Sequence, residues 1–357
     1  MRGLPVLLFL ASFLAASARA EDAPATRFPA PQAEQREMVV YSTLDTDLAA
    51  PLIRAYQARH PGIAVLYEDL LTGDLHQRVT RESRERGVTA DFTFSSAMDL
   101  QVKLVNDGLA RPVVTAKTEN WPQWANWRDT AYALTYEPAV FAYHIPSFRG
   151  RHPPATRAEL MNWIATDPQA QGRIGTYDIA RSGVGYLFLA RDQQLFPQIW
   201  QIIAAMGRAG VQQFPTSGEL LERIGDGRLA FGYNLLGSYA AEAARRNPDL
   251  GLILPKDFTV VVSRVAVVPD KAASPDLGAG FLDFLMSNEG QTLLSETLRL
   301  PAVSLEVLGG PGPVGGMQDL SGLRLKPVPV SPGLLAYLDQ AMRRRLIDRW
   351  NRTLAGE

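Results

Sequence analysis

The chain has 357 residues, of which 46% are hydrophobic and 20% are charged, a balance typical of globular proteins that argues against long disorder. A chain of this length is expected to fold as two domains or one large one. Its 36 basic and 37 acidic residues give a formal charge of −1, which argues against a nucleic-acid partner. The absence of cysteine excludes disulfides, thiolate metal sites and cysteine nucleophiles.

Residues 1–20 have the pattern of a cleaved secretory signal peptide. Arg2 is the only charged residue ahead of an apolar run over 4–18, which ends in the small-x-small pattern Ala18-Arg19-Ala20. The run is shorter than the roughly 20 residues of a membrane-spanning helix, although an uncleaved anchor is the alternative. Cleavage removes Arg2 and Arg19 and no acidic residue, so the formal charge changes from −1 to −3. We therefore expect a periplasmic protein that begins with a flexible leader over 21–36.

The mature chain then alternates predicted strands and helices. Apolar runs predict strands over 38–41, 63–67, 91–94, 139–143 and 229–233, and a longer β-branched run covers 259–268. Helical periodicity predicts helices over 48–56, 74–86, 99–106, 157–165, 184–191, 198–207, 220–226, 238–246, 277–286 and 291–298. A Gly/Pro-rich segment over 309–316 leads to a basic helix over 332–354. Strand, polar loop and helix in repetition favour a parallel sheet with helices on its faces.

Several segments, in order along the chain, resemble one protein family. They are Val39-Val40-Tyr41-Ser42-Thr43-Leu44-Asp45, His60-Pro61-Gly62-Ile63, Ala90-Asp91-Phe92 with Ser95-Ser96, Gly175-Thr176-Tyr177-Asp178 with Ser182-Gly183-Val184-Gly185, and Phe281-Leu282-Asp283-Phe284-Leu285 with Ser287-Asn288-Glu289-Gly290-Gln291. The ordered set resembles the extracellular solute-binding proteins of ABC importers over nearly the whole mature chain. The most similar branch is that of the ferric-ion, sugar-phosphate and phosphoglycerate-type periplasmic proteins.

The resemblance implies a type II periplasmic-binding-protein fold, in which two α/β lobes joined by crossing strands enclose a central cleft. Lobe one is then expected over 37–133 plus 264–310, and lobe two over 134–263 plus 311–357. The β-branched run over 259–268 is expected to be a hinge strand between them.

Candidate ligand-binding residues follow the predicted strands, because ligands of open α/β sheets bind at the carboxyl ends of strands. Hydroxyls beside free N–H groups at helix starts suit an oxyanion, and glycines allow close backbone approach. Helix capping is the alternative for Ser42, Thr43, Asp45, Ser95 and Ser96. The remaining candidates are Thr176, Tyr177, Asp178, Ser182, Gly183, Gly185, Asn234 and Tyr239. Hydrogen bonds on the hinge side are the alternative for Tyr177 and Asp178, and packing on its own helix is the alternative for Tyr239.

Direct iron binding is disfavoured, although ferric-binding relatives suggest it as an alternative. Those relatives carry two adjacent tyrosines after the strand that corresponds to 229–233, whereas here Tyr233 and Tyr239 are six residues apart. Asp45 stands where the family has a histidine in its first loop. The four histidines are scattered (His60, His76, His144 and His152), so no metal and no cofactor are expected.

The most favoured function is therefore the periplasmic capture of a small polar anion, such as an organic phosphate or a sugar phosphate, for an ABC permease in the inner membrane. A binding protein that presents its ligand to a membrane sensor kinase is an alternative that the sequence does not separate from the first. An exported hydrolase is a third alternative, but the sequence shows no nucleophile elbow or metal-ligand cluster, and we expect no enzymatic activity.

Overall fold

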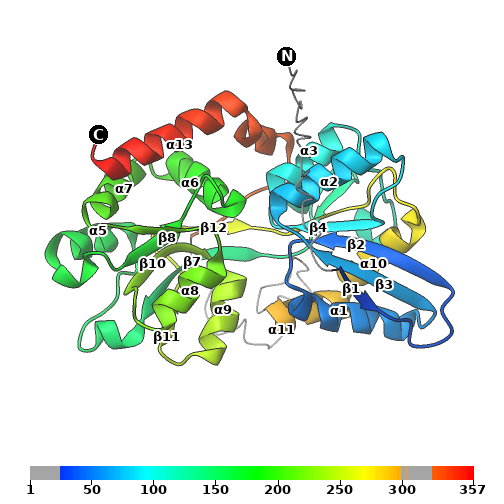
Figure 1. Ribbon diagram of the computed structural model, residues 1–357, viewed down its shortest axis with the longest axis horizontal. Coiled ribbons are helices and arrows are strands. Elements are labelled where there is room, and N and C mark those ends of the chain that lie inside the picture. Colours follow the sequence, from blue (N-terminus) through cyan, green and yellow to red (C-terminus); the bar gives the residue numbers. More distant parts are fainter. Residues whose placement is uncertain (1–24, 299–302, 304–323) are drawn as a thin grey trace, which may run out of the picture.

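The computed structural model describes residues 25–298, 303 and 324–357, so the predicted signal peptide and the Gly/Pro-rich segment over 309–316 lie outside the described residues. The strands form two sheets, and each sheet with its covering helices makes one lobe of an elongated molecule (Figure 1). The two-lobed α/β architecture implied by the family resemblance is therefore confirmed. The predicted residue limits of the two lobes stay a prediction.

The first sheet is the core of lobe one. In spatial order its strands are β1 (Ala25–Phe28), β3 (Ile63–Asp69), β2 (Arg36–Ser42), β4 (Phe92–Ser95), β13 (Val265–Val267), β6 (Ala131–Ala133) and β5 (Asn126–Trp127). As predicted, β2 runs parallel to both β3 and β4. However, β13 is antiparallel to its neighbours β4 and β6, because it enters the sheet from the other lobe, so this sheet is mixed.

The flexible leader expected over 21–36 is wrong for the part that the structure describes, which is residues 25–36. Residues 25–28 form β1, an edge strand that pairs antiparallel with β3. Further along, the backbone N–H of Gln35 donates to Gly62 O at 2.9 Å. This strand has no apolar signal in the sequence, because an edge strand pairs on one side only, needs little burial and can therefore be polar.

The second sheet is the core of lobe two. In spatial order its strands are β14 (Leu325–Pro327), β12 (Thr259–Val262), β7 (Glu137–His144), β10 (Phe231–Leu236), β8 (Ile174–Tyr177) and β9 (Gln212–Phe214), and β11 (Leu250–Ile253) also pairs with β7. The strands β8, β9 and β10 run parallel to one another, so their carboxyl ends meet at one edge. The central strand β7 runs antiparallel to β10 and β12, which makes this sheet mixed as well.

Amphipathic helices cover both sheets and confirm the helices expected from the periodicity up to residue 298. In lobe one they are α1 (Thr46–Arg59), α2 (Thr72–Glu85), α3 (Met98–Asn106), α4 (Ala116–Glu119), α10 (Pro275–Met286) and α11 (Asn288–Leu298). In lobe two they are α5 (Arg157–Thr166), α6 (Gly183–Leu195), α7 (Ile199–Arg208), α8 (Ser217–Gly225) and α9 (Gly237–Arg246). In α7, for example, Ile199, Ile202, Ile203 and Met206 are all fully buried.

The chain crosses between the lobes at residues 134–136, and again where β12 ends and β13 begins. The run over 259–268, expected to be one hinge strand, is two strands that belong to different sheets and are separated by Ser263 and Arg264. The two crossings are joined, because Leu134 N–H donates to Arg264 O at 3.0 Å and Arg264 N–H donates to Thr135 Oγ1 at 2.8 Å.

The C-terminal segment bridges the lobes a further time. The single helix expected over 332–354 is instead a 3₁₀ helix, η4 (Pro332–Leu338), followed by α13 (Gln340–Ala355). The break has a local cause, since the Asp339 carboxylate caps α13 by accepting from Met342 N–H at 2.7 Å. The 3₁₀ helix packs on α3 of lobe one, and α13 packs on α7 of lobe two (Figure 1).

Candidate functional site

A cavity of about 550 Å³ lies between the two lobes. Its lobe-one wall comes from the loops after β2, β3 and β4, and its lobe-two wall comes from the loops after β8, β9 and β10. These strands present their carboxyl ends to the cavity, which is where ligands of open α/β sheets bind. The cavity is therefore the candidate binding site.

The N-terminal ends of several helices line this cavity, among them those of α2, α6 and α8. In lobe two, Ser182 caps α6 by accepting from Gly185 N–H at 3.2 Å, and Thr216 caps α8 by accepting from Glu219 N–H at 3.3 Å. In lobe one, Thr72 and the residues after it at the start of α2 line the opposite side. The first N–H groups of a helix have no partner within it and carry partial positive charge. Three such ends around one cavity make it suited to an oxyanion.

Hydroxyl groups form the floor on the lobe-one side. Thr43 and Ser96 lie on adjacent loops, and their side-chain oxygens are 3.5 Å apart. The backbone N–H of Ser96 donates to Thr43 Oγ1 at 3.1 Å, which fixes the Thr43 side chain. Both residues can therefore offer a hydroxyl from a rigid position.

Arg264, at the crossing of the lobes, places a guanidinium group at the bottom of the cavity. Its Nη1 donates to Thr43 O at 3.0 Å and to Thr43 Oγ1 at 3.2 Å, and its Nε lies 3.1 Å from Glu137 Oε1. Burial acts to lower the pKa of Arg264, but Glu137, Tyr239 and Tyr67 together raise it by more, so the net shift is upward and the guanidinium stays charged. The Glu137 carboxylate is itself buried and accepts from Ser238 Oγ at 2.8 Å.

Acidic side chains are also present, and all of them come from lobe one. Asp45, Asp69 and Asp74 line the cavity. Burial raises the pKa of Asp69 to about 6, with the nearby charge of Asp45 acting in the same direction. Asp45 accepts a hydrogen bond from Tyr239 Oη at 2.7 Å, and this bond joins lobe one to lobe two across the cavity.

Seven of the residues predicted from the sequence line the cavity: Thr43, Asp45, Ser96, Tyr177, Ser182, Gly183 and Tyr239. Tyr177 faces it only in part, because its hydroxyl contacts Ser217 Oγ and accepts from Leu236 N–H at 3.1 Å. Burial raises the pKa of Tyr177 to about 12, so its phenol is neutral at physiological pH. The alternative of helix packing for Tyr239 does not account for its hydroxyl, which contacts Asp45.

The other six predicted residues do not line the cavity, and most of their polar groups are bonded within the protein. Ser42 Oγ donates to Phe94 O at 3.0 Å, Ser95 Oγ accepts from Ala97 N–H at 3.2 Å, and Thr176 Oγ1 donates to Tyr233 O at 3.4 Å. Asp178 accepts from Ala180 N–H at 3.0 Å. Gly185 lies against Tyr177, where a Cβ would be 2.4 Å from the tyrosine Cβ.

Asn234 belongs to a buried polar cluster in lobe two rather than to the cavity. Its Nδ2 donates to Asp192 Oδ2 at 2.6 Å, and Asp192 in turn pairs with Arg157 at 3.0 Å. Asn234 has a backbone φ of 54° at a register shift in β10, a conformation that asparagine tolerates better than most residues. This residue therefore shapes the strand that leads to the cavity.

Several lining residues were missed by the sequence reasoning, above all Arg264, Asp69, Thr72, Arg181 and Thr216. Thr216 followed by Glu219 has the spacing of a helix cap and is a signal that the sequence did contain. Arg264 had a signal too, because it is a charged residue inside a β-branched run. No sequence signal placed Asp69 at the cavity, since only the pairing of β3 with β2 brings it beside Asp45.

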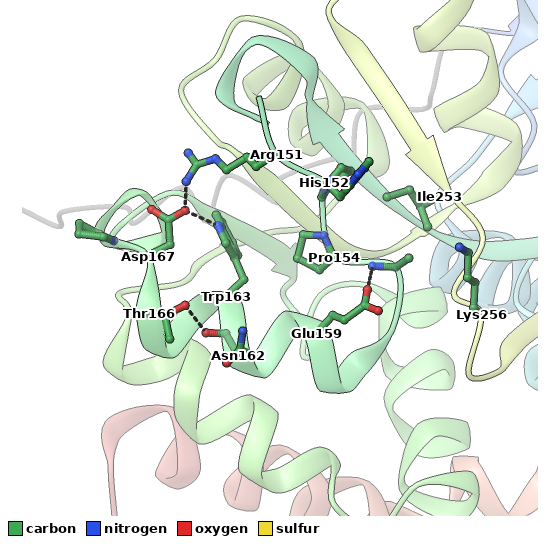
Figure 2. Close-up of a pocket in the computed structure, with 13 residues that line it drawn as sticks. Arg151, His152, Pro154, Glu159, Asn162, Trp163, Thr166, Asp167, Ile253 and Lys256 are labelled. Atoms are coloured by element: carbon green, nitrogen blue, oxygen red, sulfur yellow. Dashed lines mark hydrogen bonds and ion pairs between the residues drawn. The ribbon is translucent and has the colours of Figure 1, made fainter. Parts of the chain in front are cut away.

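A larger cavity of about 980 Å³ lies on lobe two alone, between α5 and the end of β11 (Figure 2). Several of its polar side chains are bonded within lobe two. Arg151 and Trp163 both contact the Asp167 carboxylate, and Glu159 accepts from Ala155 N–H at 2.7 Å. This larger cavity involves only one lobe, and no helix start at a strand end lines it. The cavity between the lobes therefore remains the candidate site.

Over 25–298, 303 and 324–357, no group of three or more His, Cys, Asp or Glu side chains is placed to hold a metal ion. Among the helices in the same ranges, none is both long and apolar enough to cross a membrane.

Comparison with known proteins agrees with this geometry. Residues 38–297 match the family model of the bacterial extracellular solute-binding proteins. The crystal structure of an ABC-transporter substrate-binding protein from Agrobacterium tumefaciens is 54% identical, with a TM-score of 0.87, over 93% of this chain and 98% of that one. No curated protein matches the sequence.

More distant structures share the fold. The periplasmic binding protein AfuA of Actinobacillus pleuropneumoniae, with fructose-6-phosphate bound, is 16% identical with a TM-score of 0.72 over 90% of this chain and 99% of that one. Iron-bound HitA of Pseudomonas aeruginosa is 16% identical with a TM-score of 0.69 over 88% and 99%. At this identity the likeness concerns the fold, and the two proteins hold different ligands.

Proposed function

Because the chain belongs to the bacterial extracellular solute-binding proteins, we propose that it captures a small polar anion between its lobes and delivers it to an ABC permease in the inner membrane. The anion class that fits best is an organic phosphate or a sugar phosphate. Export through the predicted signal peptide to the periplasm is part of the same proposal, as is a role in binding rather than catalysis.

The observation that supports an anion most directly is the meeting of helix starts at one cavity. The starts of α6 and α8 line it from lobe two, and the start of α2 lines it from lobe one. Each start offers N–H groups that no carbonyl of its own helix accepts. The hydroxyls of Ser182 and Thr216 accept capping bonds, and the hydrogen of each hydroxyl remains able to donate to an oxyanion.

Capture is expected to work by closure of the lobes. A ligand that contacts both walls stabilises the closed arrangement by the difference in its affinity for the closed and open forms. One hydrogen bond already spans the cavity, from Tyr239 Oη to Asp45. Gly183 also lies close to the opposite wall, because a Cβ on it would be 3.3 Å from Thr72 Oγ1. The walls therefore leave little free space at this point.

The test is titration calorimetry of the mature protein with inorganic phosphate, sulfate, glucose-6-phosphate and ferric ion. We expect stoichiometric binding of at least one phosphate compound. Binding of ferric ion alone, or of none of the four, contradicts the proposal.

Two matched variants locate the site. Thr216→Val and Thr156→Val each remove a helix cap of the same geometry, since Thr156 Oγ1 accepts from Glu159 N–H at 3.1 Å at the start of α5. Only Thr216 lines the cavity. We expect Thr216→Val to weaken phosphate-compound binding roughly tenfold, about 1.4 kcal/mol, and Thr156→Val to leave it unchanged. Equal effects of the two variants would show that stability, not ligand contact, is being measured.

The sensor-kinase alternative stays a prediction from the sequence. The proposal favours the permease because the 54% identical structure is described as a substrate-binding protein of an ABC transporter. Retention of the ligand-bound protein on membranes that contain the permease, compared with a sensor ectodomain, separates the two partners.

A further inference from the structure

The two walls of the cavity differ in charge. The lobe-two wall contributes Arg181 and the positive ends of α6 and α8, and within the described chain no lobe-two residue that lines the cavity is acidic. The lobe-one wall contributes three carboxylates, Asp45, Asp69 and Asp74, beside the start of α2, and the one basic side chain that lines it in the described chain is Arg264 at the lobe crossing. A ligand whose only charged group is negative is attracted by the lobe-two wall and repelled by the carboxylates of the lobe-one wall.

The positive charge of Arg264 does not cancel these acids. It forms a buried ion pair with Glu137 at 3.1 Å, and both side chains are almost fully inaccessible to solvent. Its Nη1 is directed to Thr43, which it contacts through both the backbone and the hydroxyl oxygen. Glu137 thus balances the charge of Arg264. Arg264 still lowers the pKa of Asp69, but burial and the charge of Asp45 raise it by more, and the three carboxylates leave the lobe-one wall net negative.

The structural hydrogen bonds of Asp45 and Asp69 do not use all the acceptor sites of these two carboxylates. Asp45 is the cap residue of α1 but makes no capping hydrogen bond with its side chain, and its carboxylate accepts from Tyr239 instead. Asp69 is half-buried beside it and accepts from the backbone of Thr46. A carboxylate has about four acceptor sites, so both retain capacity for a further donor.

We propose that the ligand is a zwitterion, with an ammonium group held by Asp69 and Asp45 and an oxyanion held by the starts of α6 and α8. This inference rests on the proposed function and narrows its ligand to amino-substituted phosphates, phosphonates or similar small molecules. Arg181 and the helix ends take the negative end, and the lobe-one carboxylates take the positive end. Closure then brings each pole of the ligand to a wall of opposite charge.

The experiment compares compounds that differ by one ammonium group. The pairs are glucosamine-6-phosphate with glucose-6-phosphate, and O-phosphoethanolamine with ethyl phosphate, each titrated into the wild-type protein by calorimetry. We expect the amino member of at least one pair to bind at least tenfold more tightly, which is about 1.4 kcal/mol. Equal or weaker binding of the amino member in both pairs overturns the inference while leaving the proposed anion site intact.

Ethanolamine has an ammonium group and no oxyanion, so its binding distinguishes a failure of the zwitterion inference from a failure of the proposed anion-binding function. If it binds as tightly as O-phosphoethanolamine, the oxyanion half is wrong and the proposed function fails. If no compound binds at about 1 mM, both proposals fail.

The variant Asp69→Asn tests the residue itself. It should reduce the preference for the amino member to less than about threefold and leave or improve the binding of the plain phosphate, because a repelling charge is removed. Asp249→Asn, on an exposed part of lobe two, is the control for net charge and should retain the preference. An unchanged preference in Asp69→Asn contradicts the assignment, and Asp45→Asn repeats the test if Asp69→Asn does not fold.

Discussion

Arg264 stands between the two sheets, and its guanidinium reaches the cavity while Glu137 balances its charge from the buried side. A buried pair of this kind costs much desolvation, so it is weak evidence for stability taken as a whole. Removing one partner is different, because the remaining charge is then buried without compensation.

We therefore expect Arg264→Met to lower the free energy of unfolding by about 3–5 kcal/mol in urea titrations. The double variant Arg264→Met with Glu137→Gln should recover part of that loss, because the amide is neutral, its oxygen can still accept from Thr135, and its NH2 can donate to the Ser238 hydroxyl oxygen after that hydroxyl turns. A double variant less stable than Arg264→Met alone would show that Glu137 is stabilised by something other than the arginine.

Asp99, the second residue of α3, predicts a pH effect on stability. Burial raises the pKa of this carboxyl to about 6, although Leu100 N–H donates to it at 2.9 Å, and Arg343 of α13 is the nearby positive charge. An acid whose pKa is higher in the folded state binds its proton more tightly there. Its contribution to stability is therefore greatest below about pH 4 and falls as the pH rises towards 6.

Asp99→Asn removes this penalty. Thermal unfolding should show the variant more stable than the wild type by about 1–3 kcal/mol at pH 8 and close to it at pH 4. A gain of the same size at both values would mean that protonation of Asp99 is not the cause.

At the level of single residues, the sequence predicted the hydroxyls of the site better than its charges. Thr43, Ser96 and Ser182 follow strands that the apolar pattern makes visible. Asp69 becomes a site residue only through the pairing of β3 with β2. The sequence marks Arg264 as a charged residue inside a β-branched run, but only the pairing of β13 with β4 places it at the site. Local sequence patterns contain no information on such pairing, and the net-negative wall was therefore not foreseen.

Helix α6 shows how an element places a binding group. Gly183 and Gly185 lie two residues apart at its start but face different neighbours. A Cβ on Gly185 would lie 2.4 Å from Tyr177 Cβ within lobe two, whereas a Cβ on Gly183 would meet only Thr72 Oγ1, at 3.3 Å across the cavity.

The two alanine variants should therefore separate stability from binding. Gly185→Ala should lower the free energy of unfolding by about 1–3 kcal/mol, because α6 must move away from β8. Gly183→Ala should keep wild-type stability and weaken ligand binding, since its methyl group meets lobe one only on closure. Urea unfolding and calorimetry on both variants check this, and a loss of stability in Gly183→Ala would contradict the placement of Thr72.

The sequence predicted most elements of the two lobes because strong apolar periodicity and Gly/Pro turns mark them. The errors fall where tertiary contacts decide. The edge strand β1 has no apolar pattern of its own, the run over 259–268 divides because its halves pair with different sheets, and Asp339 ends η4 by capping α13.

At the scale of the whole molecule, the proposed function requires that the lobes move as two bodies. The connections that permit this are the crossings at 134–136 and at 263–264, with the C-terminal segment packed on both lobes (Figure 1). The Tyr239–Asp45 bond joins the two walls in this structure, and we expect opening of the lobes to break it.

The most direct test is the distance between two spin labels, one on each lobe, measured by pulsed electron paramagnetic resonance. Because the chain has no cysteine, Glu85→Cys in α2 and Glu222→Cys in α8, both exposed, provide the labelling positions. A second pair within lobe two, Arg208→Cys with Glu222→Cys, is the control. We predict that glucosamine-6-phosphate or O-phosphoethanolamine shortens and narrows the distance distribution of the first pair and leaves the second unchanged. Identical distributions for the first pair with and without every phosphate compound would contradict capture by closure of the lobes.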